Sequence, residues 1–246
     1  MIRFNTEQRF IVTGASSGIG EGVALLLNEL GATVIGIGRH QERLNAMKAK
    51  AVYPENMFTE QKDLTENIER LPAYVKQLKE KYGKFSGMAY CAGIAEIKPL
   101  SVTKAEDLQH VFDINYLSPV MMLKGIVDKR NNTGKGTSAV LIVSAAAVVF
   151  DRGHTAYCGS KAALKASCKC IAKETAPAGI RVNCVLPSDI NTPMTQAVSG
   201  MREDPRSKYP MGIGEVSDVA NMVVFLLSDK AKWVTGQDYI VDCASF

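Results

Sequence analysis

Short apolar runs alternate with longer amphipathic stretches along this chain. The apolar runs have the length of strands buried on both faces, and the longer stretches repeat their apolar positions with helical spacing. This alternation predicts one parallel, doubly wound sheet with helices on both faces and right-handed crossovers. The predicted strands are 9–12, 33–37, 57–61 (the weakest), 85–91, 139–143, 181–186 and 239–241, and the predicted helices include 18–30, 65–81, 104–128, 155–176 and 216–227.

Two segments interrupt the alternation. Residues 131–136 form a polar, glycine-containing loop, and residues 191–214 are longer and rich in proline and glycine. A long irregular stretch inside a compact domain is typical of a lid or binding loop, although disorder is the alternative. Three methionines in it, Met194, Met201 and Met211, favour a lid over an adaptable apolar pocket. We therefore expect a single domain over residues 1–246, with a substrate lid around 191–214.

Composition excludes several classes of protein. Apolar residues make up 46% of the chain and charged residues 22%, which is typical of a soluble globular protein. The net charge of +4 is mild and its basic residues are scattered, so no nucleic-acid surface is predicted. The longest uncharged run, 136–150, is shorter than the roughly 20 residues of a membrane-spanning helix. No signal peptide is evident at the start, and we expect a cytoplasmic protein without membrane partners.

Cysteine and histidine spacing gives no sign of a disulfide framework or a metal site. The cysteines form no Cys-x-x-Cys pair, and the histidines are far apart in the sequence. We expect reduced thiols and no metal. The residues concerned are Cys91, Cys158, Cys168, Cys170, Cys184 and Cys243, with His40, His110 and His154.

A glycine-rich turn joins the first predicted strand to the first helix. Gly14, Gly18 and Gly20 lack a Cβ, so the backbone can turn sharply and approach a pyrophosphate at the positive end of the helix. Ser16 and Ser17 offer hydroxyl contacts. The spacing is Gly-x-x-x-Gly-x-Gly rather than Gly-x-Gly-x-x-Gly, and by itself it is also consistent with simple packing.

The end of the second strand carries Arg39 where NAD-specific folds place an acid for the ribose 2′-hydroxyl. A guanidinium matches a 2′-phosphate in charge and geometry. We therefore predict NADPH or NADP⁺ rather than NADH as the cofactor. The alternative is that Arg39 caps its strand or pairs with Glu42.

A tyrosine and a lysine share one helix face, because Tyr157 and Lys161 are four residues apart. A lysine cation close to a phenol lowers the phenol's pKa from its usual value of about 10. Alone the pair is unremarkable in a chain with eight tyrosines. Ser144, however, ends an apolar strand, and carboxyl ends of strands face the ligand crevice in such sheets. We expect the three side chains to converge on one substrate.

These motifs resemble those of the short-chain dehydrogenase/reductase family over essentially the whole chain. The resemblance implies a Rossmann fold with a sheet of about seven strands in the order 3-2-1-4-5-6-7, and an NAD(P)-dependent oxidoreductase interconverting ketones and secondary alcohols. Its residues are Thr13-Gly14-x-x-x-Gly18-Ile19-Gly20, Asp63-Leu64, Ala92-Gly93, Asn115, Ser144, Tyr157-x-x-x-Lys161, Arg181-Val182-Asn183, Pro187, Thr192-Pro193-Met194 and Thr235-Gly236-Gln237.

The resemblance also implies roles for the site residues. Tyr157 is the expected proton donor, Lys161 tunes Tyr157 and holds the nicotinamide ribose, and Ser144 orients the substrate carbonyl. Asn115 is expected to hold a water that links Lys161 to solvent. Asp63 and Leu64 are expected around the adenine, with Ile190 and Thr192 at the carboxamide. The full predicted cofactor set is Gly14, Ser16, Ser17, Gly18, Ile19, Gly20, Arg39, Asp63, Leu64, Cys91, Ala92, Gly93, Tyr157, Lys161, Pro187, Ile190 and Thr192.

Three positions depart from the family pattern. Tyr90-Cys91-Ala92-Gly93 replaces a frequent Asn-Asn-Ala-Gly, which removes amide hydrogen bonds near the adenosine ribose. Pro187-Ser188-Asp189 replaces Pro-Gly near the nicotinamide, and Val241-Asp242-Cys243-Ala244 replaces a final Val-Asp-Gly-Gly. None of these changes touches the four predicted catalytic residues.

The sequence leaves the substrate open. Size and motif spacing most resemble the 3-oxoacyl-[acyl-carrier-protein] reductase branch, in which basic residues beside the active-site mouth dock an acyl carrier protein. Lys129 and Arg130 are the candidates here, but Ala178 stands before Gly179 where a second basic residue is common. Small ketones, polyols and sugars are the alternative substrates. A non-catalytic NADP(H) sensor or scaffold is the remote alternative, opposed by the presence of Ser144, Tyr157 and Lys161.

Two of the predicted helices, 104–128 and 155–176, carry apolar or small residues around much of their circumference. One stripe packs on the sheet, so a second stripe needs another partner. In the resembled family these helices form a bundle between subunits. We therefore expect a homotetramer, or a dimer.

Overall fold

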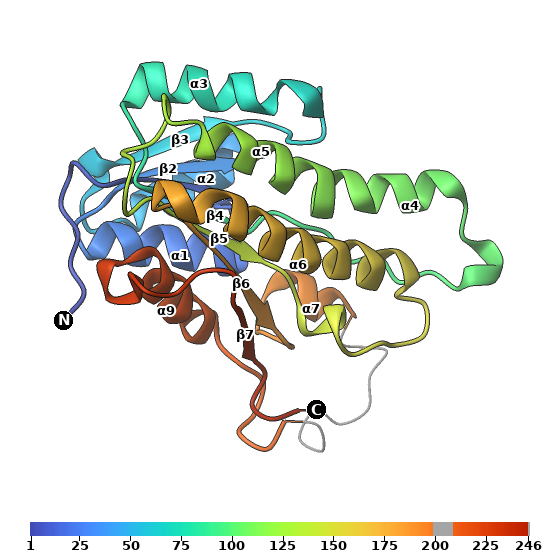
Figure 1. The fold of residues 1–246 in the computed structure, drawn as a ribbon. Helices are drawn as coiled ribbons and strands as arrows, with labels where there is room; N and C mark the ends of the chain where they lie inside the picture. The colour runs from blue at the N-terminus through green and yellow to red at the C-terminus, as the bar shows by residue number, and fades with distance from the viewer. Residues whose placement is uncertain (199–208, 246) are drawn as a thin grey trace.

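A single parallel sheet of seven strands organises the chain, in the order β3-β2-β1-β4-β5-β6-β7 (Figure 1). The computed structural model describes residues 1–198 and 209–245. The predicted fold class and strand order are confirmed. The strands are β1 Arg9–Thr13, β2 Thr33–Gly38, β3 Met57–Gln61, β4 Gly87–Tyr90, β5 Ser138–Ile142, β6 Arg181–Pro187 and β7 Asp238–Val241.

Helices cover both faces of the sheet, with α1, α2 and α9 on one face and α3 to α6 on the other (Figure 1). Successive residues of a strand point to opposite faces, and each face therefore has its own apolar core. In β1, Phe10 and Val12 enter the core under α1, whereas Ile11 enters the core under α5. The helices are α1 Gly18–Glu29, α2 Gln41–Ala49, α3 Leu71–Tyr82, α4 Ala105–Phe112, α5 Ser118–Val127, α6 Thr155–Thr175, α7 Pro193–Val198 and α9 Val216–Leu227.

Strand β4 is shorter than the predicted strand 85–91. Phe85 makes only an isolated bridge to Asn132 before the strand begins. Beyond the strand, the backbone N–H groups of Cys91 and Ala92 donate to the Thr13 hydroxyl at 3.1 and 3.2 Å. This side-chain acceptor replaces the strand ladder, so the chain turns at Cys91 and leaves the sheet.

The predicted helix 104–128 is interrupted by one wide π turn, Asp113–Leu117, between α4 and α5. Side-chain donors reach carbonyls of this turn. The Ser118 hydroxyl donates to Asp113 O at 2.7 Å, and the Tyr90 phenol donates to Ile114 O at 3.2 Å. Such turns occur often at functional sites, and this one buries Asn115 completely.

The predicted helix 65–81 begins later, because Asp63 favours a turn. Its carboxylate accepts hydrogen bonds from both the N–H and the hydroxyl of Thr65, and local bonds of this kind compete with a helix. Asn67 then adopts a left-handed conformation, and α3 begins at Leu71. Helix α2 was not predicted from the sequence, because its buried positions are only Leu44 and Met47.

The predicted lid 191–214 is partly described. Residues 199–208, which include Met201, lie outside the described residues. The segment enters through α7 and returns through a parallel bridge, in which Asn191 N donates to Gly214 O and Gly214 N donates to Asp189 O. The two ends of the segment are therefore held together at the base.

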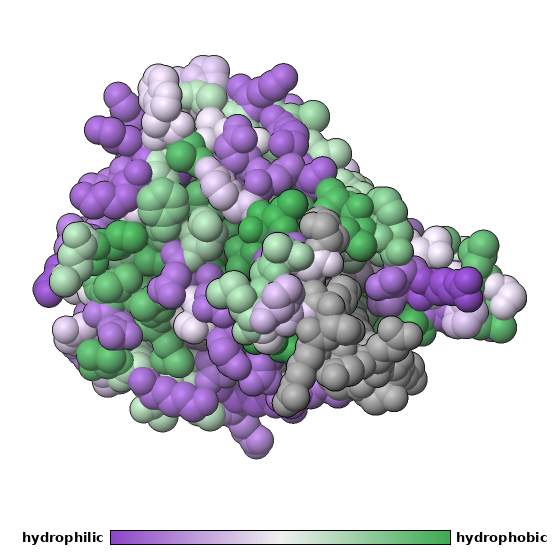
Figure 2. All heavy atoms as spheres, turned by 90° about the horizontal axis from the view of Figure 1, so that it is seen from below, coloured by the Kyte–Doolittle hydropathy of each residue, from purple (hydrophilic) through white to green (hydrophobic). Residues whose placement is uncertain are grey.

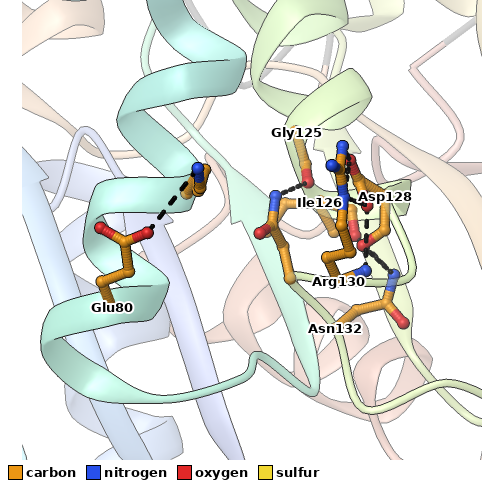
Figure 3. A network of polar contacts seen from close by, with 8 residues as sticks. Glu80, Gly125, Ile126, Asp128, Arg130 and Asn132 are labelled. Atoms are coloured by element: carbon orange, nitrogen blue, oxygen red, sulfur yellow. Dashed lines mark hydrogen bonds and ion pairs between the residues drawn. The ribbon is translucent and has the colours of Figure 1, made fainter.

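The loop after α5 is fixed by side-chain amides that cap the last carbonyls of the helix (Figure 3). Asn131 Nδ2 donates to Gly125 O at 2.8 Å, and Asn132 Nδ2 donates to Ile126 O at 2.8 Å. Arg130 forms an ion pair with Asp128, at 2.5 Å between Nη2 and Oδ2. These bonds satisfy carbonyls that a helix end leaves without partners.

Some of the surface is apolar. Figure 2 shows apolar side chains gathered over the end of the molecule where α9 lies. Trp233, which follows α9, is 95% exposed, and Ile240 on the edge strand β7 is also exposed. Among the described residues, no helix combines the length and the apolar character needed to cross a membrane.

Candidate active site

A groove and an adjoining cleft lie beyond the carboxyl ends of the strands, where open α/β sheets bind ligands. The groove is lined by the glycine-rich turn and the end of β2, and the cleft by Ser144, Tyr157 and the segment after β6. Several residues line both, so the two are continuous. They are Ile19, Cys91, Gly93, Ile94, Thr192 and Met194.

The glycine-rich turn has the conformation that its sequence predicts. Gly14 and Gly18 both have positive φ, at +66° and +57°. A Cβ on Gly20 would lie 2.3 Å from the Gly14 carbonyl oxygen, and a Cβ on Gly14 would lie 2.9 Å from Ala92 N. Any larger residue at either position would therefore force the turn open.

The turn fits a pyrophosphate at the start of α1. Ser17 is the N-cap residue in an extended conformation, and its side chain makes no capping bond. The first N–H groups of the helix are thus left to a ligand, at the positive end of the helix dipole. Ser16, Ser17 and Ile19 all line the groove. These features match a dinucleotide phosphate.

The Cys91 and Ala92 segment closes the other side of the groove. The Thr13 hydroxyl holds it from below, and Gly93 leaves room for two neighbours, since a Cβ there would meet Asn115 Oδ1 at 3.0 Å and Lys161 Nζ at 3.4 Å. The hydrogen bonds from the backbone of Cys91 and Ala92 to the Thr13 hydroxyl fix this segment. Its geometry therefore does not depend on the asparagine side chain that is frequent in the family at the position of Cys91.

Basic side chains gather at the β2 end of the groove. Arg39 is 58% exposed, and its Nη1 lies 4.0 Å from Asp63 Oδ2. His40, Arg43 and Lys62 line the same part of the groove. Arg43 lies in the first turn of α2, directly after the end of β2, and it was not predicted from the sequence.

Asp63 does not itself line the groove, whereas Lys62 and Leu64 on either side of it do. Burial acts to raise the pKa of Asp63, but the hydrogen bonds from Thr65 and the charges of Arg39 and Lys62 hold it below its usual value. Asp63 is therefore an anion beside Arg39.

Lys161 is a buried basic group in the wall of the cleft. It is 4% exposed, and its Nζ donates to Ile142 O at 2.9 Å. Burial lowers its pKa to about 8. The neighbouring Cys91 thiol provides no counter-ion, because burial raises its pKa to about 12. A bound anion or a phenolate would favour the charged ammonium.

Tyr157 and Ser144 line the cleft beside Lys161. The Lys161 Nζ lies 5.9 Å from the centre of the Tyr157 ring, which places both on the face of α6 that the spacing predicts. The Ser144 hydroxyl oxygen accepts a hydrogen bond from Ala146 N at 3.1 Å. Its own proton is consequently left to donate toward the cleft.

Asn115 is buried behind Lys161. Its side-chain amide accepts from Ile94 N at 3.0 Å, donates to Ile94 O at 2.9 Å and also donates to Ser160 Oγ at 3.2 Å. Ser160 in turn donates to Tyr157 O at 2.8 Å. The amide thus ties the segment after β4 to the first two turns of α6, which hold Tyr157 and Lys161.

The segment after β6 forms the far wall. Pro187, Ile190 and Thr192 line the cleft, and their contact with a nicotinamide stays a prediction. The Thr192 Cγ2 packs against Gly18, where a Cβ would lie 3.3 Å away. Sequence reasoning did not assign His154 and Asp151 to the site, although both line the cleft. Among the described residues, no cluster of three His, Cys, Asp or Glu is placed to hold a metal.

Comparisons with known proteins agree with this geometry. Residues 14–243 match the family model described as "Enoyl-(Acyl carrier protein) reductase". The chain is 32% identical to a 3-oxoacyl-[acyl-carrier-protein] reductase of Thermotoga maritima, over 94% of this chain and 95% of that protein. It is 33% identical to an NAD-dependent glycerol dehydrogenase of Listeria innocua, over 96% of this chain and 93% of that protein.

The fold matches solved structures equally well. A short-chain dehydrogenase/reductase from Mycobacterium ulcerans superposes with a TM-score of 0.89 at 32% identity, covering 99% of this chain and 91% of the other. A glucose/ribitol dehydrogenase of the same type from Brucella melitensis gives 0.91 at 26% identity, covering 100% and 99%. This chain therefore belongs to the short-chain dehydrogenase/reductase family of NAD(P)-dependent oxidoreductases that act on alcohol and carbonyl groups.

Proposed function

We propose that the protein reduces a ketone to a secondary alcohol with NADPH, and that Tyr157 is the proton donor. One observation carries the proposal: Ser144, Tyr157 and Lys161 share a cleft that continues into a groove ending in basic side chains. These three side chains can transfer a proton to a substrate in the cleft, and the groove can bind a phosphorylated dinucleotide.

Bound NADPH supplies the hydride that reduces the carbonyl carbon. The protein's part is to hold and protonate the oxygen. The Ser144 hydroxyl donates to the carbonyl oxygen and stabilises the charge that develops there. The Tyr157 phenol then gives its proton to that oxygen, and the Lys161 ammonium stabilises the resulting phenolate. Asn115 holds the start of α6 in place and so positions Tyr157 and Lys161. We also propose that it organises a proton path to Lys161, the role predicted from the sequence.

The preference for NADPH is supported by the charge at the β2 end of the groove. Arg39, Arg43 and Lys62 are cationic, and the dianionic 2′-phosphate of NADPH would form ion pairs with them. One carboxylate oxygen of Asp63 accepts hydrogen bonds from Thr65, and the other lies 4.0 Å from Arg39 Nη1.

A 3-oxoacyl thioester is the second candidate substrate, favoured by the name of the Thermotoga maritima relative. Lys129 and Arg130, the pair predicted to dock the carrier protein, do not lie beside the cleft of their own chain. Arg130 pairs with Asp128, and the next residue, Asn131, accepts a hydrogen bond from Phe85 at the amino end of β4. The cleft lies at the opposite end of that strand, on the order of 20 Å away. Lys129 and Arg130 therefore do not flank the cleft of their own chain.

We also propose that the chain self-associates. Partly buried apolar side chains on the α4–α6 side, among them Tyr116, Val120 and Met121, pack at the edge of the core. Exposed Trp233 and Ile240 add apolar surface near β7. We infer a homotetramer, and a light-scattering mass near 26.7 kDa, that of one chain, would contradict it.

The test of the activity is direct. Oxidation of NADPH and of NADH is followed by absorbance with small ketones, keto-sugars and an acetoacetyl thioester. We expect NADPH-dependent turnover of at least one ketone. Tight NADPH binding without turnover of any substrate in the panel would instead indicate a sensor.

A further inference from the structure

His154 is held rigidly at the wall of the cleft. It closes a turn in which its N–H donates to Asp151 O, and its own carbonyl accepts the first helical bond of α6 from Cys158 N at 2.8 Å. Gly153 in this turn has φ +80°, and its carbonyl accepts from Lys98 N at 2.8 Å. Backbone bonds on both sides therefore fix the backbone of His154 at the wall of the cleft.

The orientation of the His154 ring is also defined. Its Nδ1 lies 3.1 Å from Arg152 O. A carbonyl oxygen only accepts, so Nδ1 carries the proton, and in a neutral imidazole the other nitrogen, Nε2, is then an acceptor. The ring lines the cleft and its centre lies 6.4 Å from that of Tyr157, which has the proton-donor role in the proposed reaction.

We propose that His154 determines substrate specificity by accepting a hydrogen bond from a hydroxyl group on the carbon next to the reacting carbonyl. The proposed substrate class is therefore α-hydroxy ketones. This inference rests on the proposed function, since it places the reacting carbonyl at Ser144 and Tyr157. An acceptor at this position favours a hydroxyl over the second carbonyl of a 3-oxoacyl thioester, because two acceptors facing each other leave both unsatisfied.

The remaining lining combines polar and apolar residues, and the segment after β6 contributes Ser188, Asp189 and Thr195. The cleft near His154 also contains Asp151, which is exposed at its rim. Much of the rest is apolar and suits a short alkyl substituent. These apolar lining residues are Ile94, Ala95, Ile97, Val149 and Met194.

The experiment compares two ketones that differ by one hydroxyl, 1-hydroxy-2-butanone and 2-butanone, with NADPH. Wild type, His154→Leu and His154→Gln are assayed, and His110→Leu is the matched control, since His110 is exposed on α4 away from the cleft lining. The His154 side chain makes no capping bond to α6, so its replacement leaves the helix start intact. NADPH affinity and melting temperature are measured for each variant to verify that the fold is retained.

We expect the wild type to favour the hydroxy ketone in kcat/KM by about tenfold, the value of one hydrogen bond. His154→Leu abolishes this preference because its kcat/KM falls about tenfold more on the hydroxy ketone than on 2-butanone, His154→Gln restores part of the preference through its amide oxygen, and His110→Leu retains it fully. Equal wild-type efficiency on both ketones, or an equal loss on both in His154→Leu, would overturn the assignment and leave the ketoreductase proposal standing. Turnover of the acetoacetyl thioester alone would overturn the substrate class. Lack of NADPH oxidation with any carbonyl compound would overturn both proposals.

Discussion

Replacing Lys161 with methionine should abolish turnover and stabilise the folded protein. The ammonium is 4% exposed, and burial lowers its pKa from 10.5 to about 8. That shift corresponds to about 3 kcal/mol of destabilisation at neutral pH. Methionine has a similar length and no charge, but it forfeits the hydrogen bond to Ile142 O, at a cost of about 1–2 kcal/mol. The expected net gain is about 1–2 kcal/mol.

The stability that Lys161→Met gains over the wild type depends on pH. Below pH 8 the folded wild type must keep a proton on a buried amine, while the unfolded chain carries it in water at no cost. As the pH rises from about 8 toward 10.5, the unfolded chain loses its proton too, and the wild type recovers stability. The advantage of Lys161→Met is therefore largest at pH 7 and declines as the pH rises through that window.

Urea unfolding of the cofactor-free protein at pH 7 and at pH 9.5 measures both effects, and thermal melting should show a rise of about 4 °C at pH 7. Lys173→Met is the matched control, because Lys173 is exposed on the same helix and such surface changes stay within about 0.5 kcal/mol. A destabilised Lys161→Met at pH 7, or a difference that does not change with pH, would refute the reasoning that burial of the ammonium costs stability.

Three further changes test separate parts of the site. Tyr157→Phe should lower kcat by about 10²–10⁴-fold, the usual contribution of a general acid, with little change in NADPH affinity by titration; substantial residual kcat would remove Tyr157 from the proton-donor role. Arg39→Asp should move the ratio of kcat/KM for NADPH over NADH toward NADH by at least about tenfold, since one charge-assisted contact is lost and a repulsion gained; an unchanged ratio would show that Arg39 does not bind the phosphate. Gly20→Ala places a Cβ 2.3 Å from Gly14 O, so cofactor affinity measured by fluorescence should fall sharply, and normal affinity would show that the turn adapts.

Local patterns in the sequence were sufficient to predict most of the fold. Apolar runs of strand length, separated by helices, indicate a parallel sheet because only buried strands dispense with polar positions. The glycine-rich turn and the Tyr157–Lys161 spacing depend on neighbouring residues, and their geometry agrees with the sequence-based expectation. Their cofactor and catalytic roles stay predictions until the assays above are made.

Other features depend on contacts between segments far apart in the chain. The sequence alone did not reveal the π turn at Asn115, because it is completed by Ser118 within the helix and by Tyr90 from β4. Similarly, the hydrogen bonds that Asp63 accepts from Thr65 and its approach to Arg39 were not expected from the sequence, and its predicted place near the adenine stays a prediction.

Tertiary structure also decided which charged and polar groups meet at the site. Lys129 and Arg130 were expected beside the active-site mouth, and the strand direction puts their loop at the opposite end of the sheet from the cleft of the same chain. Conversely, a backbone bond between Lys98 and Gly153 brings two loops together and fixes His154 beside Tyr157. The sequence determines local conformation through the chemistry of adjacent residues, whereas burial, pKa and the composition of the cleft arise only when distant segments pack together.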